Sequence, residues 1–400
     1  MSYYVTHLES AIDGTHFPPD QLHTTHSGRP LWVRYDLEAV RRSVDRDQLI
    51  RRPSGLWRYR ELLPLPPGHE PVTLGETITP LLPAGELGRL CGVQNLWIKD
   101  ESRLPGGTFK SRGMTLAISM ARRFGVKRVA LPTAGNAGGA AALYAAAAGM
   151  EAFVFMPDDT PAVNQYEAAL AGARVYRVRG LISDCGNIVR SLQHETGWLD
   201  LSTLREPYRL EGKKTMGLEL AEQFQWRLPD VILYPTGGGT GLIGMWKAFQ
   251  ELSTLGWLNS EKLPRMVAVQ SDGCCPIVRA FQRGERFAQP FPNAHTIASG
   301  IRVPSAVGDF MMLDTLRASQ GTAVAVPEAS IPDWMRIATR LTGIPICPEA
   351  AACVGALQKL AAEGWIHPEE HVVLFNTATA LKYVETIQTP IPEWKGKLER

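Results

Sequence analysis

From about residue 95 onward, short apolar runs alternate with longer amphipathic or alanine-rich segments. The apolar runs have the length of strands, and the segments between them have the length and composition of helices. Strands that alternate with helices imply parallel sheets covered by helices on both faces, so we predict an α/β protein. The predicted strands are residues 96–99, 128–132, 152–156, 174–178, 230–234, 266–270 and 371–375, and the predicted helices are residues 109–124, 136–149, 162–171, 241–252, 329–342 and 350–363.

The chain is long enough to require more than one domain. Its 400 residues exceed the size at which a single hydrophobic core usually stays compact. Consecutive strand–helix units at 128–179 indicate a small domain inserted into a larger one. We therefore expect a small α/β domain at 115–200 and a large domain made of 71–114 and 201–400. Residues 1–70 differ from the rest: they contain a strand-like segment at 31–35, a predicted helix at 37–48 and a proline-rich end at 63–67. We expect them to form an extension wrapped on the main body.

Composition argues against several classes of function. The formal net charge is only +2, so no global field attracts nucleic acid or anionic lipid. No apolar run is long enough to span a bilayer, and the first 18 residues lack the basic start and apolar core of a secretory signal. Six cysteines form no CxxC pair and are too sparse for a disulfide framework. We expect a cytoplasmic protein with reduced thiols and with neither nucleic-acid nor membrane partners.

Lys110 is the first residue that suggests chemistry. It follows a predicted strand and a Pro-Gly-Gly turn, and it falls in the first turn of the next predicted helix. Positive charge at a helix N-terminus is unfavourable, so the local field is expected to lower the pKa of this amine. A neutral amine is the form that attacks an aldehyde. From this segment by itself, an ordinary surface lysine near a helix start is an equal alternative.

Two small-residue loops each join a predicted strand to a predicted helix. The loop 132–139 places Asn136 where an N-cap would stand, although the small residues around it would also let a flat ring approach the backbone. The loop 235–241 contains three consecutive glycines before a helix. Backbone N–H groups in such a loop can surround an oxyanion, and phosphate is the natural ligand.

The second loop also permits a nicotinamide interpretation. It contains Gly239-x-Gly241-x-x-Gly244, and Asp272 ends the next predicted strand, where a ribose ligand would stand. It is not a P-loop, because no GK[ST] follows. A nicotinamide domain would leave the Lys110 and Asn136 segments without a role, so this alternative is the weaker one.

A fourth segment follows the predicted strand 371–375. Thr377 and Thr379 come directly after this strand, at the end where parallel sheets bind ligands. Capping of the next helix is the competing use of these hydroxyls. Glu349 begins another predicted helix, where its carboxylate favourably meets the dipole, and it is a secondary site candidate.

Taken in this order, the segments resemble the fold type II family of pyridoxal-phosphate (PLP) enzymes, which share the tryptophan synthase β-chain fold. The likeness is strongest to the threonine-synthase-like members and covers residues 29–382. Its most specific part is 99–113, which resembles the family motif K-D-E-S…P-T-G-[ST]-F-K-D-R-G. The resemblance implies two parallel-sheet α/β domains with the cofactor in the cleft between them, and a homodimer.

The resemblance also implies roles for individual residues. Lys110, preceded by Phe109, would form a Schiff base with PLP and then move protons as base and acid. Asn136 would hydrogen-bond the phenolate oxygen of PLP. Thr377 would face the pyridine nitrogen, and a hydroxyl there favours eliminations and replacements over transamination. The implied phosphate cradle is Gly237, Gly238, Gly239, Thr240 and Gly241, and the implied substrate-carboxylate site is Thr133, Ala134 and Gly135.

The implied reaction is a β,γ-elimination and replacement that converts O-phospho-L-homoserine and water into L-threonine and phosphate. Departures from the family motif leave a rival open. Residues 104–108 read Leu-Pro-Gly-Gly-Thr, Ser111 replaces an aspartate, and Ala134 replaces a hydroxyl residue. Polar groups are therefore missing where a phosphorylated substrate would need them. The alternative is a β-elimination or β-replacement on a serine, threonine or O-phosphoserine type of amino acid, as in a dehydratase or a cysteate synthase. A non-catalytic protein with this fold is a third hypothesis.

The N-terminal region departs from the family as well. Several relatives begin with a cysteine-based zinc knuckle, but here no cysteine precedes Cys91. Histidines would be unusual as the whole ligand set of a structural zinc site, so we expect exposed loop histidines and no metal. The histidines of this region are His7, His16, His23 and His26.

Overall fold

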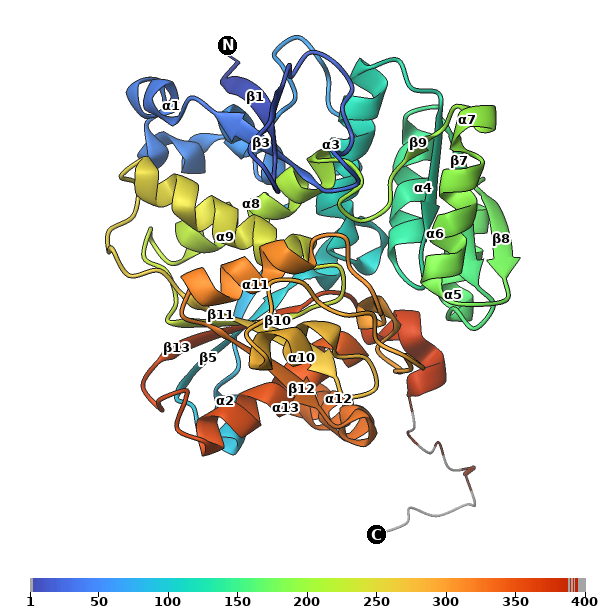
Figure 1. Cartoon of the computed structure of the whole chain (residues 1–400). Coiled ribbons are helices and arrows are strands. Elements are labelled where there is room, and N and C mark those ends of the chain that lie inside the picture. The colour runs from blue at the N-terminus through green and yellow to red at the C-terminus, as the bar shows by residue number, and fades with distance from the viewer. Residues whose placement is uncertain (1–2, 388, 390, 392, 395–400) are drawn as a thin grey trace.

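The computed structural model describes residues 3–387, 389, 391 and 393–394. The outermost residues of the predicted extension and of the predicted large domain therefore lie outside the described part of the chain. Two sheets with parallel strands, each flanked by helices, and a small N-terminal sheet make up the molecule (Figure 1). The predicted α/β fold is confirmed.

The larger sheet has six strands in the order β12-β11-β10-β13-β5-β4. All neighbouring pairs are parallel except β4 with β5. The central strand β10 is buried along its whole length, as expected for a parallel strand covered on both faces. The strands are β4 (Leu81–Pro83), β5 (Asn95–Asp100), β10 (Val231–Pro235), β11 (Arg265–Ser271), β12 (Thr322–Val326) and β13 (His371–Asn376).

Two hydrophobic cores form on the two faces of this sheet. One contains apolar side chains of α2, α12 and α13, and the other contains those of α8, α9, α10 and α11. These helices are α2 (Gly85–Cys91), α8 (Tyr208–Gln223), α9 (Thr240–Thr254), α10 (Pro276–Gln282), α11 (Asp309–Ala318), α12 (Ile331–Thr342) and α13 (Pro348–Ala362).

The smaller sheet has four parallel strands in the order β8-β7-β6-β9. It lies beside the larger sheet, with its own helices around it (Figure 1). The strands are β6 (Arg128–Pro132), β7 (Glu151–Pro157), β8 (Arg174–Val178) and β9 (Leu199–Asp200), and the helices are α3 (Lys110–Arg123), α4 (Ala137–Ala147), α5 (Ala162–Leu170), α6 (Ile182–Ser191) and α7 (Gln193–Thr196). The proposed domain boundaries at 115 and 200 stay a prediction.

The N-terminal residues form a separate antiparallel sheet in the order β2-β1-β3. The helix predicted at 37–48 is too long, because α1 ends at Ser43. Asp45 is extended, and its side chain caps a new 3-10 helix by accepting from the N–H of Asp47. The elements of this region are β1 (Val5–Ser10), β2 (His16–Phe17), β3 (Leu31–Tyr35), α1 (Leu37–Ser43) and the 3-10 helices η1 (Arg46–Arg51) and η2 (Leu56–Leu62). Further along the described chain, the other 3-10 helices are η3 (Glu101–Arg103), η4 (Pro105–Gly107), η5 (Ser299–Ile301), η6 (Glu328–Ser330) and η7 (Ala380–Thr386).

Two sequence-based expectations concern single side chains. All six cysteines lie in the described residues and are buried and unpaired, as expected for reduced thiols. The expectation of exposed N-terminal histidines is wrong for His7, His23 and His26, which are half-buried; His16 is exposed. Across the described residues, none of the helices combines the length and apolar character that crossing a membrane requires.

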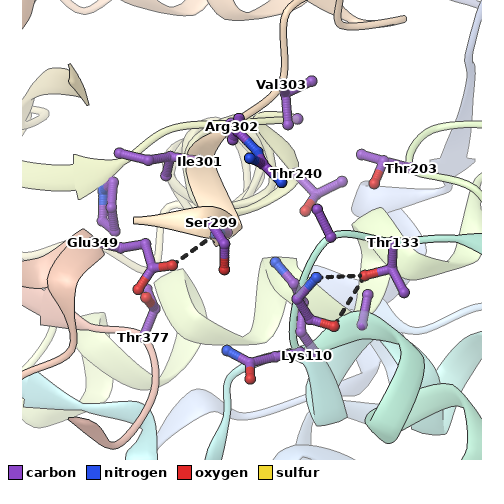
Figure 2. A pocket seen from close by; sticks show the side chains of 18 of the residues that line it. Lys110, Thr133, Thr203, Thr240, Ser299, Ile301, Arg302, Val303, Glu349 and Thr377 are labelled. Atoms are coloured by element: carbon purple, nitrogen blue, oxygen red, sulfur yellow. Dashed lines mark hydrogen bonds between the residues drawn. The ribbon is translucent and has the colours of Figure 1, made fainter. Parts of the chain in front are cut away.

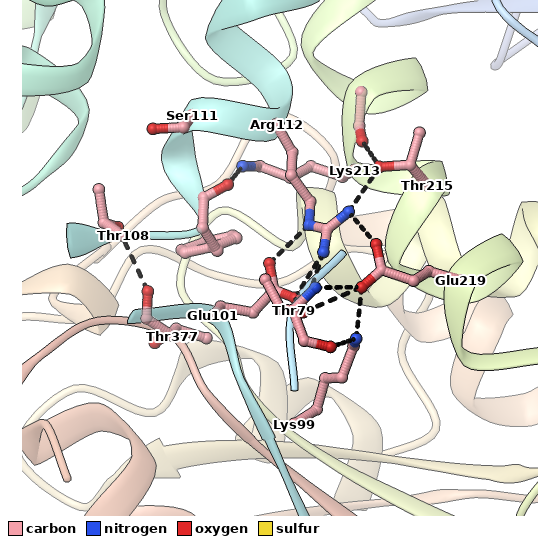
Figure 3. Close-up of polar contacts among 12 residues, drawn as sticks. Thr79, Lys99, Glu101, Thr108, Ser111, Arg112, Lys213, Thr215, Glu219 and Thr377 are labelled. Carbon is pink, nitrogen blue, oxygen red and sulfur yellow. Dashed lines mark hydrogen bonds and ion pairs between the residues drawn. The ribbon is translucent and has the colours of Figure 1, made fainter. Parts of the chain in front are cut away.

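A fully buried ion network fixes the start of α3. Arg112 Nε lies 2.6 Å from Glu101 Oε2, and Arg112 Nη1 lies 2.8 Å from Glu219 Oε2. Lys99 Nζ lies 2.5 Å from Glu219 Oε1, and Thr79 donates its hydroxyl to Glu101 (Figure 3). Burial opposes ionisation of Glu219, but the charges of Arg112 and Lys99 hold its pKa at about 2. Two cations thus balance two anions where β5, η3, α3 and α8 meet.

We predict that Glu219→Ala lowers the free energy of unfolding by about 3–5 kcal/mol, because it leaves two buried cations without an anion. Urea unfolding of the full chain measures this change. The matched control is Glu86→Ala, since Glu86 pairs with Arg89 on the surface and both side chains are 66% exposed. The control is expected to lose less than about 1 kcal/mol. Equal losses in the two variants would contradict the role given to the network.

Candidate active site

The predicted site residues come together around one cavity between the two parallel-stranded sheets. The cavity lies at the carboxyl ends of β6 and β10, and it measures about 760 Å³ counting its opening to solvent. The predicted residues in its lining are Phe109, Lys110, Thr133, Ala134, Gly135, Asn136, Gly237, Gly238, Gly239, Thr240, Gly241 and Thr377.

Lys110 is the first residue of α3, and its Nζ lies 4.0 Å from the centroid of the Phe109 ring. Burial is the main cause that lowers the pKa of this amine to about 7, and the charge of Arg209 adds to it. Glu349 and Cys347 act in the opposite direction. The predicted low pKa is therefore present, although desolvation rather than the helix dipole is its leading cause. At pH 7 about half of such an amine is neutral, against about one in 3,000 for an ordinary lysine.

Asn136 occupies the N-cap position of α4 but does not cap the helix with its side chain, which excludes the structural explanation considered from the sequence. Its side chain makes no capping hydrogen bond. Nδ2 instead donates to the hydroxyl of Tyr383 at 2.8 Å. Oδ1 is buried and has no partner within the described residues. A buried polar atom without a partner is costly, so the amide is a group that a ligand would satisfy.

The glycine loop 237–241 leads into the N-terminus of α9. Gly239 has a φ of 81°, a conformation that favours glycine. A Cβ on Gly238 would lie 2.5 Å from the side chain of Thr203, and a Cβ on Gly241 would lie 2.0 Å from the hydroxyl of Tyr234. Side chains are therefore excluded at Gly238 and Gly241. The first N–H groups of α9, which have no partner inside the helix, remain beside the cavity for an anion.

The loop after β6 is held by one hydroxyl. Thr133 Oγ1 accepts from the N–H of Gly135 at 3.1 Å and lies 3.0 Å from the carbonyl oxygen of the same residue (Figure 2). A Cβ on Gly135 would lie 3.5 Å from Ser299 Oγ, so this loop faces η5 across the cavity. Because the Gly135 N–H already donates to Thr133, the carboxylate-binding role of Thr133, Ala134 and Gly135 stays a prediction.

Several lining residues were not predicted from the sequence. Ser299 Oγ is buried and lacks a hydrogen-bond partner in the part of the chain that the structure describes. Arg302 also lines the cavity and pairs with Asp159 of the smaller-sheet region at 2.6 Å. Ser299 begins η5 and Arg302 follows it, in the connection between α10 and α11 rather than in a strand–helix turn. The signal in the sequence was limited to a Ser-Gly pair, which is common in ordinary loops.

Glu349 lies on the Thr377 side of the cavity (Figure 2). Its Oε1 accepts from the N–H of Gly300 at 2.7 Å, and its Oε2 has no partner among the described residues. Burial raises the pKa of this carboxyl group. Thr377 Oγ1 lies 3.7 Å from the sulfur of Cys347. Glu349 therefore faces the cavity as well as beginning α13, which strengthens its place among the site candidates.

The groups that line the cavity fit one kind of bound molecule. A largely neutral amine can condense with an aldehyde, and a glycine loop at a helix N-terminus can hold a phosphate. Both face one cavity in which the Asn136 amide and the Ser299 hydroxyl have unsatisfied atoms among the described residues. These features define an enzyme built around a phosphorylated aldehyde cofactor.

Comparison with known proteins agrees with this class. The model of the family described as pyridoxal-phosphate dependent enzyme matches residues 72–378. The chain belongs to this family, whose cofactor is pyridoxal 5'-phosphate.

Relatives and solved structures place the chain more closely. It is 33% identical to a threonine synthase of Methanocaldococcus jannaschii over 90% of this chain and 89% of the relative. It is 35% identical to a threonine synthase of Methanosarcina acetivorans over 95% of this chain and 93% of the relative. The structure of maize serine racemase is similar with a TM-score of 0.65 and 22% identity, covering 76% of this chain and 88% of the other. The predicted fold type II architecture is confirmed, and the nicotinamide alternative is wrong.

We predict that Lys110 of the cofactor-free protein reacts with an acylating reagent with a midpoint near pH 7, because its pKa is about 7. Peptide mass spectrometry after labelling at a series of pH values measures this midpoint. Arg209→Met is expected to raise the midpoint by removing a positive charge, and Glu349→Gln is expected to lower it by removing a negative one. Exposed Lys127 serves as the internal control. Identical midpoints for the two lysines would contradict the prediction.

Proposed function

We propose that the chain is a PLP-dependent threonine-synthase-like lyase. It would convert O-phospho-L-homoserine and water into L-threonine and phosphate by β,γ-elimination and replacement. The observation that carries this proposal is a second cavity, lined by arginines, that adjoins the cavity of Lys110. Similarity to threonine synthases along most of the chain supports the same reaction.

The arginine cavity suits a dianionic group. It is lined by Arg29, Arg190 and Arg205, and no Asp or Glu of the described residues lines it. It shares Thr203 and Gly238 with the cavity of Lys110, so one substrate can reach both. The phosphate-binding groups that residues 104–111 lack would thus come from three other segments of the chain.

The charges in this cavity are not balanced. Arg205 Nε is buried and has no partner in the described residues, whereas Arg29 pairs with Asp309 at 3.3 Å. Burial lowers the pKa of Arg205, and the positive charges of Arg190 and Arg29 add to this effect. A phosphate bound between these side chains would relieve the repulsion and accept charge-assisted hydrogen bonds.

When bound, PLP supplies an aldehyde that condenses with amines and a ring that stabilises negative charge at the substrate α-carbon. Lys110, with a pKa of about 7, can accept a proton from that carbon and return it later. The glycine loop 237–241 would hold the cofactor phosphate, and Asn136 would orient the ring through its amide. Thr377 offers a hydroxyl rather than a carboxylate, so it adds no charge that would keep a ring nitrogen protonated. Glu349, whose pKa burial raises, is a second group able to hold a proton.

The rival function is a β-elimination or β-replacement on a serine, threonine or O-phosphoserine type of amino acid. Elimination from an unphosphorylated amino acid needs no subsite for a phosphate, so the arginine cavity favours the first proposal over a reaction of serine or threonine. The amino-acid substrate, the cytoplasmic location and the homodimer stay predictions.

We predict that Lys110→Ala abolishes the visible absorbance that stays with the protein after loading with PLP and removal of unbound cofactor, and that it lowers turnover by at least about 10²-fold. The variant lacks both the amine that captures the aldehyde and the group that moves the proton. Absorbance spectra and phosphate release measure the two effects. The control is Lys127→Ala, an exposed lysine that should keep wild-type colour and rate. An active, coloured Lys110→Ala enzyme would refute the assignment.

We predict that Arg205→Met raises KM for O-phospho-L-homoserine by about 10- to 100-fold, the range given by loss of a hydrogen bond to a charged group. The affinity for PLP should not change, because Arg205 does not line the cavity of Lys110. Steady-state phosphate release and cofactor titration measure the two quantities. Exposed Arg179→Met is the matched control. Keto-acid release from serine or threonine by the wild-type enzyme, without phosphate release from phosphohomoserine, would instead establish the rival function.

A further inference from the structure

A cluster of potential metal ligands lies on the N-terminal sheet, away from the cavity of Lys110. His7 and Glu9 are two residues apart in β1, and successive alternate residues of a strand share a face. Glu9 pairs directly with His16 of the antiparallel neighbour β2. The register of this short hairpin therefore gathers two imidazoles and one carboxylate on one face.

The distances within the cluster are close to those that a metal ion needs. His7 Nε2 lies 3.6 Å and His16 Nε2 lies 3.8 Å from Glu9 Oε2, and one ligand atom from each residue lies within 4.8 Å of the others. A tetrahedral zinc ion with ligands at about 2.1 Å separates those ligands by about 3.4 Å. Small side-chain rotations would therefore close the three ligands around an ion.

The hydrogen bonds of His7 leave the ligand nitrogen free. The Thr6 hydroxyl donates to the carbonyl oxygen of Arg34 at 3.2 Å, so its oxygen is left to accept from His7 Nδ1 at 2.9 Å. The proton of a neutral His7 then sits on Nδ1, and Nε2 presents a lone pair. Nε2 is buried, has no partner in the described residues, and faces the carboxylate of Glu9. Two electron-rich groups that face each other favour a cation between them, and a partner on Nδ1 is the usual support for a metal-binding histidine.

The other groups around the cluster leave room for an ion. Arg34 pairs with Glu9 through Oε1 at 2.6 Å, so Oε2 remains for coordination. The His7 and His16 rings lie 3.9 Å apart, and protonating both would place two positive charges against each other. The His16 side chain is 64% exposed, which keeps a fourth coordination position open to water.

We propose that His7, Glu9 and His16 bind a divalent transition-metal ion, with water as the remaining ligand. Two imidazoles and one carboxylate are a donor set typical of zinc. The ion would join β1 to β2 and so fasten the N-terminal hairpin. This proposal reverses the expectation of no metal drawn from the sequence. It does not depend on the proposed reaction, because none of the three residues lines the cavity of Lys110.

The experiment is a Zn²⁺ titration of the PLP-loaded full-length enzyme by calorimetry, with metal content measured after gel filtration. We expect one zinc ion per chain and a rise in the thermal unfolding midpoint on addition of Zn²⁺. His16→Ala should remove the binding, and Thr6→Val should weaken it by about 10- to 100-fold through loss of the partner of Nδ1. His194→Ala, which changes an exposed histidine on α7, should bind as the wild type does.

Two outcomes would overturn the proposal. One is the absence of zinc binding by the wild-type enzyme, and the other is unchanged binding by His16→Ala. Since His16 is largely exposed, its variant should fold even where a change at His7 does not. Cofactor absorbance and turnover are measured on the same samples. Failure of the proposed reaction would show in those readouts, and failure of the metal site would show in the titration.

Discussion

The position of Lys110 depends on the buried ion network around Arg112. Lys99 and Glu101 precede the Pro-Gly-Gly turn and Arg112 follows it, and Glu219 of α8 joins the two sides. Both ends of the turn are therefore fixed by charged side chains that do not line the cavity. Because low dielectric strengthens these pairs and makes a lone charge costly, α3 has little freedom to rotate or slide. The amine of Lys110 is directed into the cavity by groups that take no part in its chemistry.

Placing an amine in this cavity gives it the pKa that the chemistry needs. Burial disfavours the charged form, and the nearby guanidinium of Arg209 disfavours it further, while the carboxylate of Glu349 opposes them. The balance leaves the amine close to half-neutral at pH 7. An α/β fold with two sheets favours this arrangement, because the carboxyl ends of both sets of strands meet at one cleft. That cleft shields the amine and also brings it opposite the N-terminus of α9.

Sequence reasoning found what local patterns encode. Strand and helix periodicity located β6 and β8 to the residue, and glycines before a helix located the anion loop, because a local steric rule acts at each position. Sequence reasoning failed where a site is formed by segments that are far apart in the chain. The charges of Arg29, Arg190 and Arg205 meet only after folding, and Ser299 faces Gly135 only across the cavity. The end of α1 was missed because Asp45 caps η1, and this capping competes with a continuous helix. The strands β4, β9 and β12 were not predicted.

Charge balance separates the structural ionic groups of this molecule from those that await a ligand. Lys99 and Arg112 are matched by Glu101 and Glu219, and between α8 and α9 a second buried set matches two cations with two anions. Such sets are complete, and adding an ion to them would be unfavourable. The arginine cavity has an excess of positive charge in its described lining, whereas on the His7–Glu9–His16 face Arg34 already matches the charge of Glu9 and only His7 Nε2 lacks a partner among the described residues. The excess charge of the arginine cavity suits an anion from solution, and the unpartnered nitrogen on the N-terminal sheet suits a metal ion.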